Sequence, residues 1–265
     1  MPELPEVELV RRMLEPALTG ATIDAVEVRR ADLRIPFPVG FGDRLTGQRV
    51  TALTRRAKYL LAALSSGETL LVHLGMSGDF RVEAGPPSDQ GRHDHVVFTL
   101  SSGRTVTFND PRRFGLMDLV AGHGLDTYPA LAGLGPEPLS PAFDAAALAR
   151  ACRGKRVAVK VALLDQRVVA GVGNIYASEA LHAAGISPRR RAAILATRTG
   201  APTPAAHRLA SAIVRVLTRA IDKPAARFKV YERAGEPCPR RGCDGVITRR
   251  VLAGRSTFYC PRCQR

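Results

Sequence analysis

The chain begins with the octet MPELPEVE, in which two prolines stand among glutamates. Removal of the initiator methionine, which the small side chain of Pro2 permits, exposes a secondary amine. An α-amino group titrates near a pKa of about 8 and a lysine near about 10.4, so the terminal amine is the better neutral nucleophile. Its attack on a sugar C1′ gives an iminium, an electron sink, and Glu3 beside it is a candidate acid–base group. The octet alone also suits a simple helix start, which remains an open alternative.

Four of the five cysteines fall within the last 28 residues. Four residues separate Cys238 from Cys243, two separate Cys260 from Cys263, and sixteen lie between the pairs. Such knuckles can supply four thiolates to one tetrahedral Zn²⁺, and so short a segment has too small a core to fold without a staple. We predict one structural zinc, because free thiols or disulfides fit a reducing compartment less well. Arg255 would then sit on a rigid hairpin, aimed at a phosphate or simply solvated.

The charge of the chain indicates a polyanionic partner. Lysine and arginine number 39 against 24 acidic residues, which gives a formal net charge of +15 and a pI near 10.6. Nucleic acid is the commonest partner for such a chain. No apolar run reaches the length of a membrane span and no signal peptide is evident, so we expect a cytoplasmic, nucleoid-associated protein without membrane contact.

The elements that must position these residues follow from the periodicity of the sequence. Apolar residues at helical spacing predict a helix over 4–18, and alternating runs from 22 to 119 predict a sandwich or a barrel. A stretch at 128–141 rich in Pro and Gly reads as a linker, and helical periodicity then continues to about 222. We therefore expect an α+β chain with a catalytic domain at 1–127, a linker at 128–141, a helical domain at 142–222, and a lid and metal-stapled hairpin at 223–265. Cys152, alone on a helical pattern, is expected to be a small buried residue.

Nine motifs in order give the chain a family resemblance. They are MPELPEVE, RRAKYLL, HLGMSG, HDH, NDPRRFG, LGPEPLS, LLDQ, AGVGNIYASEAL and GRSTFYCPRCQ. Together they resemble the bacterial formamidopyrimidine-DNA glycosylases, which share a fold with the endonuclease VIII type. The resemblance covers essentially the whole chain. It implies an N-terminal β-sandwich with an N-terminal helix, a helical helix-two-turn-helix domain and a zinc-finger hairpin, in a monomer that acts on double-stranded DNA containing an oxidised base.

The resemblance also implies roles for individual residues. Pro2 would be the nucleophile and Glu3 its acid–base partner, with Lys58 assisting β-elimination and Arg255 δ-elimination. Three residues match the side chains that fill the void left by an extruded base, and apolar wedges with an arginine suit that task. The residues implied to contact DNA are Met76, Arg112 and Phe114, the phosphate-clamping Asn174, and His73, His93, Arg156 and Lys160. A core position for Met76 and Phe114, and a solvated surface position for the last four, are the competing interpretations.

Two departures from the family pattern bear on the substrate. The first knuckle, CPRRGC, has four intervening residues where the family usually has two. Between the last long helix and VYERAGEPC only a short segment remains, where relatives that excise 8-oxoguanine carry a longer lid. We expect a glycosylase and AP lyase that removes oxidised purines. The alternatives are an enzyme for oxidised pyrimidines and a damage-binding protein without catalysis.

Overall fold

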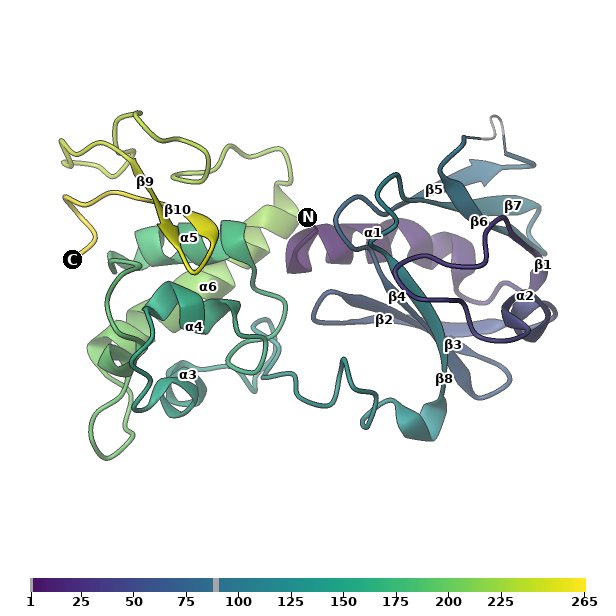
Figure 1. Cartoon of the computed structure of the whole chain (residues 1–265), viewed down its shortest axis with the longest axis horizontal. Coiled ribbons are helices and arrows are strands. Elements are labelled where there is room, and N and C mark those ends of the chain that lie inside the picture. Colours follow the sequence, from purple (N-terminus) through teal and green to yellow (C-terminus); the bar gives the residue numbers. More distant parts are fainter. Residues whose placement is uncertain (1, 88–90) are drawn as a thin grey trace. The chain divides into compact units, whose positions relative to one another are not determined.

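The structure is a computed structural model that describes residues 2–87 and 91–265. It confirms the predicted α+β class: antiparallel sheets occupy the first half of the chain, helices the second, and a hairpin the C-terminus (Figure 1). Its residues form two compact units. Pro2 and Glu6–Ala132 belong to the first, and Glu3–Pro5 and Gly133–Arg265 to the second. Met1, whose removal the proposed chemistry requires, lies outside the described residues.

The first unit is a sandwich of two four-stranded antiparallel sheets. Side chains from both sheets share one core, in which Leu60, Val72, Val96 and Val106 are buried. One sheet has the order β1-β6-β7-β5, with β1 at Ile23–Val28, β6 at Asp94–Leu100, β7 at Arg104–Asn109 and β5 at Asp79–Ala84. The other has the order β2-β3-β4-β8, with β2 at Val50–Arg56, β3 at Tyr59–Leu64, β4 at Glu68–His73 and β8 at Leu116–Ala121. A short helix α2 (Phe41–Leu45) and a 3₁₀ turn (Gly122–Gly124) complete the unit.

The N-terminal helix α1 spans Leu4–Leu18, the range that the periodicity predicts. Val7 and Leu14 are buried in the core of the sandwich, whereas Leu4 is buried in the core of the helical unit. The first turn of α1 therefore anchors the residues that follow Pro2 to the helical unit.

The second unit is built from four helices. They are α3 (Ala145–Cys152), α4 (Val159–Leu164), α5 (Asn174–Ala184) and α6 (Pro204–Asp222), with a 3₁₀ turn at Ala192–Leu195. The N-cap of α3 is Asp144, whose carboxylate accepts the N–H of Ala147 at 2.7 Å, and Thr203 caps α6 just before Pro204. Helix α5 is buried along most of its length, α4 and α6 pack against it, and α3 packs against α6. Cys152 is fully buried, as expected.

The C-terminal hairpin pairs β9 (Thr248–Leu252) with β10 (Arg255–Tyr259). Ala253 and Gly254, between the strands, have φ values of +47° and +73°. Two central residues with positive φ define the type I′ turn that suits a two-residue hairpin loop. Within the described residues, no helix is both long and apolar enough to cross a membrane.

Candidate functional site

Glu3 is buried against the start of α5. One carboxylate oxygen accepts the N–H of Ile175 at 2.8 Å, and the other accepts those of Gly173 at 2.9 Å and Tyr176 at 3.3 Å. Only 1% of the residue is exposed. Three N–H donors at a helix N-terminus stabilise the ionised carboxylate. The residue next to Pro2 is therefore a fixed negative charge.

The glycines of the AGVGN motif make room for this arrangement. A Cβ atom on Gly173 would overlap the Glu3 side chain, and one on Gly171 would lie 2.7 Å from Leu4. Gly171 also has a φ of +79°, which side chains rarely adopt. Glu3 thus accepts three N–H groups at the start of α5, those of Gly173, Ile175 and Tyr176.

Lys160 joins α4 to the start of α5 and to the hairpin. Its ammonium donates to Asn174 Oδ1 at 2.7 Å, to the carbonyl of Ser256 at 2.9 Å and to Thr257 Oγ1 at 2.7 Å. Burial lowers its pKa to about 8; the charge of Glu3 opposes this shift and that of Arg255 adds to it. Lys160 thus stays charged at neutral pH, with all three N–H groups donated within the protein. In this structure it positions neighbouring groups rather than presenting its charge to DNA.

Asn174 and Arg255 adjoin the hydrogen bond between Lys160 and the Ser256 carbonyl. The Asn174 amide also donates to the Ser256 carbonyl, at 3.0 Å. Arg255 is exposed at the first position of β10, directly before Ser256. The chain around Arg255 is therefore held by two hydrogen bonds at one carbonyl, one from Lys160 of α4 and one from Asn174 at the start of α5.

Candidate residues of the sandwich gather at one end of the β2-β3-β4-β8 sheet. Lys58 lies in the turn before β3, whose first residue, Tyr59, pairs with His73 at the end of β4. His73 in turn pairs with Leu116, the first residue of β8. The turn that carries Met76 and the loop of residues 110–115 therefore adjoin the same end of the sheet.

His73 is a neutral ring in this position. Its Nδ1 accepts the N–H of Gly75 at 3.0 Å, and the ring lies 4.9 Å from that of Tyr59. Burial, reinforced by the charges of Lys58 and Arg34, lowers the pKa of His73 to about 4. Nδ1 is an acceptor, so the neutral ring carries its proton on Nε2 and can offer one N–H to a ligand.

Met76, Arg112 and Phe114 form an exposed cluster. Met76 is 39% exposed and Phe114 is 44% exposed, although both are large and apolar. The guanidinium carbon of Arg112 lies 4.8 Å from the centre of the Phe114 ring, within cation–π range. The core interpretation of Met76 and Phe114 is therefore wrong, and their exposure fits the wedge role.

Buried Asp110 ties the two loops of this cluster together. Its carboxylate accepts the Ser77 hydroxyl at 2.5 Å and the Gly115 N–H at 2.7 Å. The Ser77 oxygen also accepts the N–H of Arg112 at 3.1 Å. Asp110 thus fixes the neighbours of Met76 on one loop and of Phe114 on the other. Sequence reasoning missed it, although Ser77 and Asp110 lie inside the motifs HLGMSG and NDPRRFG.

His93 and Arg156 are the two remaining predicted contacts. His93 immediately precedes β6; its carbonyl accepts the N–H of Asp110 at 3.0 Å. Arg156 is exposed in the segment before α4. Neither position contradicts a contact with DNA, and neither tests it.

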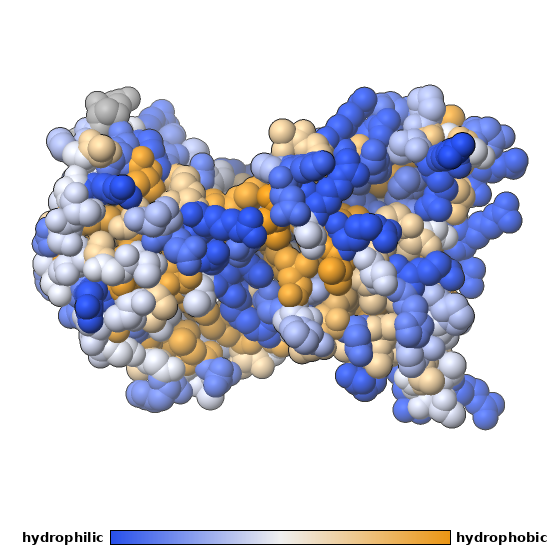
Figure 2. Space-filling view, turned by 180° about the vertical axis from the view of Figure 1, so that it is seen from behind, coloured by the Kyte–Doolittle hydropathy of each residue, from blue (hydrophilic) through white to orange (hydrophobic). Residues whose placement is uncertain are grey.

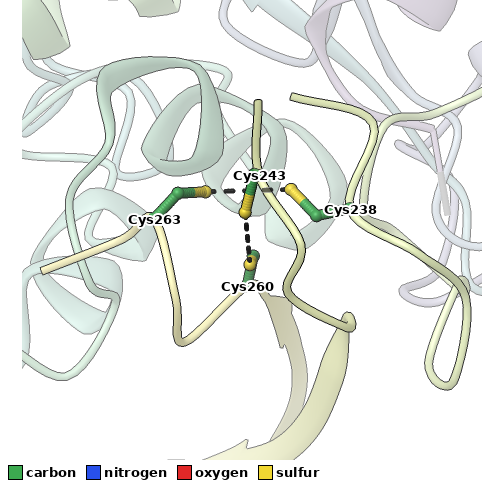
Figure 3. Close-up of side chains that lie close together, drawn as sticks. All are labelled: Cys238, Cys243, Cys260 and Cys263. Atoms are coloured by element: carbon green, nitrogen blue, oxygen red, sulfur yellow. Dashed lines mark hydrogen bonds between the residues drawn. The ribbon is translucent and has the colours of Figure 1, made fainter. Parts of the chain in front are cut away.

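The four C-terminal cysteines converge on one point (Figure 3). The sulfurs of Cys238 and Cys263 lie 3.8 Å apart, those of Cys243 and Cys260 lie 3.7 Å apart, and all four lie within 4.8 Å of one another. A tetrahedral zinc with Zn–S bonds of about 2.3 Å places its sulfurs about 3.8 Å apart. The donor set fits one structural zinc, as predicted. The four-residue spacing of the first knuckle therefore leaves the metal geometry intact.

Comparison with known families covers almost the whole chain. Residues 1–117 match the formamidopyrimidine-DNA glycosylase N-terminal domain, residues 134–231 its H2TH domain, and residues 235–265 the zinc finger found in FPG and IleRS. The formamidopyrimidine-DNA glycosylase of Rhodopseudomonas palustris strain BisA53 is 56% identical over 293 residues, which cover 100% of both chains.

Solved structures that superpose on this chain support the same family. The Lactococcus lactis Fpg bound to abasic-site DNA superposes with a TM-score of 0.88 at 31% identity, covering 99% of each chain. The same protein bound to DNA with an oxidised pyrimidine gives 0.87 at 31% identity and full coverage of both. The MutM protein of Thermus thermophilus gives 0.84 at 39% identity, covering 99% of this chain and 98% of its own. The chain therefore belongs to the formamidopyrimidine-DNA glycosylase family, whose members are bifunctional DNA glycosylases and AP lyases of base-excision repair.

Proposed function

We propose that the protein excises oxidised purines, 8-oxoguanine and formamidopyrimidines, from double-stranded DNA and then cuts the strand by β,δ-elimination. The observation that carries the proposal is the carboxylate of Glu3, buried and held by three N–H groups directly after Pro2. A fixed anion beside a nucleophilic amine stabilises the cation that forms when the amine condenses with a sugar. The family membership supports the same reaction class.

In this reaction the Pro2 nitrogen is first the nucleophile and then part of the iminium that accepts electrons during the eliminations. It attacks C1′ of the damaged nucleotide, the bond from C1′ to the base breaks, and the base leaves with the bonding pair and gains a proton. The amine loses its proton, the C1′–O4′ bond opens, O4′ is protonated, and an iminium remains between C1′ and Pro2. Loss of a C2′ proton then expels the 3′ phosphate, and loss of a C4′ proton expels the 5′ phosphate. Water finally hydrolyses the iminium and releases Pro2.

Charged residues of each unit assist these eliminations. We assign Lys58, at the end of the β2-β3-β4-β8 sheet, to the phosphate that leaves in β-elimination. Arg255, on the hairpin, is assigned to the phosphate that leaves in δ-elimination. The zinc held by the four cysteines stabilises the hairpin fold, and Lys160 and Asn174 fix its second strand, β10, to α4 and α5.

The exposed cluster of Met76, Arg112 and Phe114 is assigned to extrusion of the damaged base. Unstacking a base costs a few kcal/mol, and side chains that fill the gap recover part of that cost. Met76 and Phe114 are exposed apolar groups suited to the gap, and Arg112 can donate to the partner base that loses its pair. The formal charge of +15 supports contacts with the phosphate backbone. Hydrophilic side chains cover much of the surface in Figure 2, with apolar patches between them.

One feature supports oxidised pyrimidines as a second candidate substrate class. Helix α6 ends at Asp222, and the carboxylate of Glu179 already binds the N–H groups of Lys229, Val230 and Tyr231 at 2.8 to 2.9 Å. Only the segment 223–228 is left to cover a base. A short cover excludes less water and makes fewer contacts with the lesion, which widens the range of bases accepted. The L. lactis relative has itself been crystallised with DNA containing an oxidised pyrimidine.

A cleavage assay separates the two candidates. Duplexes carrying 8-oxoguanine opposite cytosine, a formamidopyrimidine, or an oxidised pyrimidine are incubated with the protein under single-turnover conditions. We expect both purine lesions to be cleaved faster, leaving a gap with a phosphate at each end. Faster cleavage of the pyrimidine duplex would move the substrate to the second class.

Because the substrate of such an enzyme is chromosomal DNA, we also infer that the protein is located in the cytoplasm with the nucleoid.

A further inference from the structure

The helical unit contains a cavity that none of the residues assigned to the bond-breaking steps lines. It has a volume of about 310 Å³ and lies between α5, α6, the segment 223–229 and the first cysteine knuckle. Its apolar lining comes from Tyr176, Ala183, Val216, Ala220, Pro224 and Phe228. None of Glu3, Lys160, Asn174 and Arg255 lines it.

The rim of the cavity is strongly cationic. Arg215 and Arg219 lie four residues apart on one face of α6, and Lys223 follows as the residue that caps the C-terminus of the helix. Among the residues that the structure describes, these three have no carboxylate partner. The acidic residue in the lining, Glu179, is buried, and its carboxylate accepts three backbone N–H groups. Arg227, which also lines the cavity, pairs with Glu236 at 2.7 Å, so Arg215, Arg219 and Lys223 are rim cations that lack an internal counter-charge within the described residues.

Arg240 closes the end of the cavity near the zinc. Its guanidinium donates to the carbonyl of His182, the residue whose Nε2 lies 3.4 Å from the sulfur of Cys238. Its Nε is buried and has no hydrogen-bond partner in the described part of the chain. A donor without an acceptor adds to the demand for an anionic ligand.

The spacing of the cations matches an extended peptide. Four residues of α-helix rise about 6 Å, so Arg215 and Arg219 present charges about 6 Å apart, and Lys223 adds a third cation just past the end of α6. Alternate side chains of an extended chain lie about 6.7 Å apart on one face. Acidic residues at alternate positions of such a peptide would meet the three cations in turn, and an apolar residue beside them would fill the cavity.

The aromatic residues of the lining favour a peptide over a nucleic acid. The rings of Phe228 and Tyr176 lie 6.2 Å apart at 81°, and those of Phe228 and Tyr231 lie 5.8 Å apart at 83°. These edge-to-face contacts already engage the rings, whereas single strands bind proteins through bases stacked on open ring faces. A duplex is too wide to enter a cavity of this size.

We propose that this cavity is the docking site for an acidic, extended segment of a partner protein. Carboxylates of the segment pair with Arg215, Arg219 and Lys223, and an apolar side chain enters the cavity between α5 and α6. The enzyme is thereby recruited through a surface that contains none of the side chains assigned to DNA contact, although it borders the segment 223–228 that covers the base.

The test is fluorescence anisotropy with the full-length, zinc-loaded protein. The probe is fluorescein-labelled Asp-Leu-Asp-Phe-Asp-Leu, and two control peptides replace either its apolar residues with Ser or its Asp residues with Lys. We expect saturable binding of the probe, at least about tenfold weaker binding of the Ser peptide, and none of the Lys peptide. Equal binding of the probe and the Ser peptide would reduce the site to non-specific charge attraction and overturn the proposal.

Matched variants locate the binding. The double variant Arg215→Glu, Arg219→Glu is expected to lower the affinity for the probe about tenfold. The double variant Arg150→Glu, Arg198→Glu makes an equal charge change at exposed positions outside the cavity, and it should lower that affinity less than about twofold. Ala220→Leu, which narrows the cavity, is expected to abolish the preference for the probe over the Ser peptide.

DNA provides the decisive contrast. Both double variants are expected to cleave lesion-containing duplex at equal rates. Two results would show that the surface is a nucleic-acid contact and would overturn the proposal. One is loss of duplex binding in the Arg215 and Arg219 variant alone. The other is displacement of the probe by an oligonucleotide at a concentration equal to the Kd of that oligonucleotide. Failure of the proposed glycosylase reaction would leave the peptide measurement unchanged, so the two proposals fail separately.

Discussion

Substitution of Asp110 tests whether the Met76, Arg112 and Phe114 cluster is held ready for base extrusion. The Asp110 carboxylate accepts two buried hydrogen bonds, from the Ser77 hydroxyl and the Gly115 N–H. Hydrogen bonds to a charged group contribute about 1.5–3 kcal/mol each. Asp110→Asn keeps the shape and one acceptor oxygen but removes the charge, so we expect it to cost about 2 kcal/mol in the ordering of the two loops. That cost corresponds to about a 30-fold change in rate.

The assay compares two substrates that differ in their need for a wedge. Excision of 8-oxoguanine from a duplex requires extrusion and void filling, whereas strand cleavage at an abasic site in single-stranded DNA requires neither. We expect Asp110→Asn to slow the first reaction about 30-fold and the second less than about twofold. Asp43→Asn, the same change at a position of the same unit away from the cluster, serves as the control. Equal slowing on both substrates, or none on the duplex, would refute the positioning role.

Three further outcomes follow from the site. Cys243→Ser should lower the bound zinc, measured by elemental analysis, from one atom per chain to well below one, and it should weaken duplex binding. Full retention of zinc would exclude Cys243 as a ligand. Lys160→Met should lower the midpoint of thermal unfolding and the affinity for abasic duplex, because three acceptors lose a charged donor, whereas Lys155→Met should change neither. The ring of His73 should titrate near pH 4 by NMR, and a midpoint near 6.5 would contradict its burial. Because this folded pKa lies below the unfolded value, protonation of His73 should cost stability only as the pH falls from about 6.5 toward 4.

Features set by local pattern were predictable from the sequence. Helix α1 occupies the range given by its apolar spacing, because Val7 and Leu14 must reach one core from successive turns. The zinc site was predictable because the two cysteine pairs are short local motifs and the ligand chemistry of zinc is restrictive. The two-sheet class followed from alternation, as in β3, where Leu60, Ala62 and Leu64 are buried.

Features set by contacts between distant residues were not predictable. Glu3 accepts N–H groups from residues about 170 positions along the chain, and no local pattern encodes that pairing. Lys160 is one of 39 basic residues, and its sequence neighbours do not distinguish a buried lysine from a solvated one. Asp110 was hidden for the same reason, since its partners Ser77 and Gly115 lie on two different loops.

In the proposed reaction the Pro2 nitrogen forms the bond to the sugar. The most direct measurement is borohydride trapping on a duplex with 8-oxoguanine opposite cytosine, followed by mass spectrometry of the linked peptide and of the intact chain. Our account predicts a chain without Met1 and a reduced covalent adduct on the N-terminal nitrogen of Pro2. An adduct on a lysine, or efficient strand cleavage by a chain that retains Met1, would contradict it.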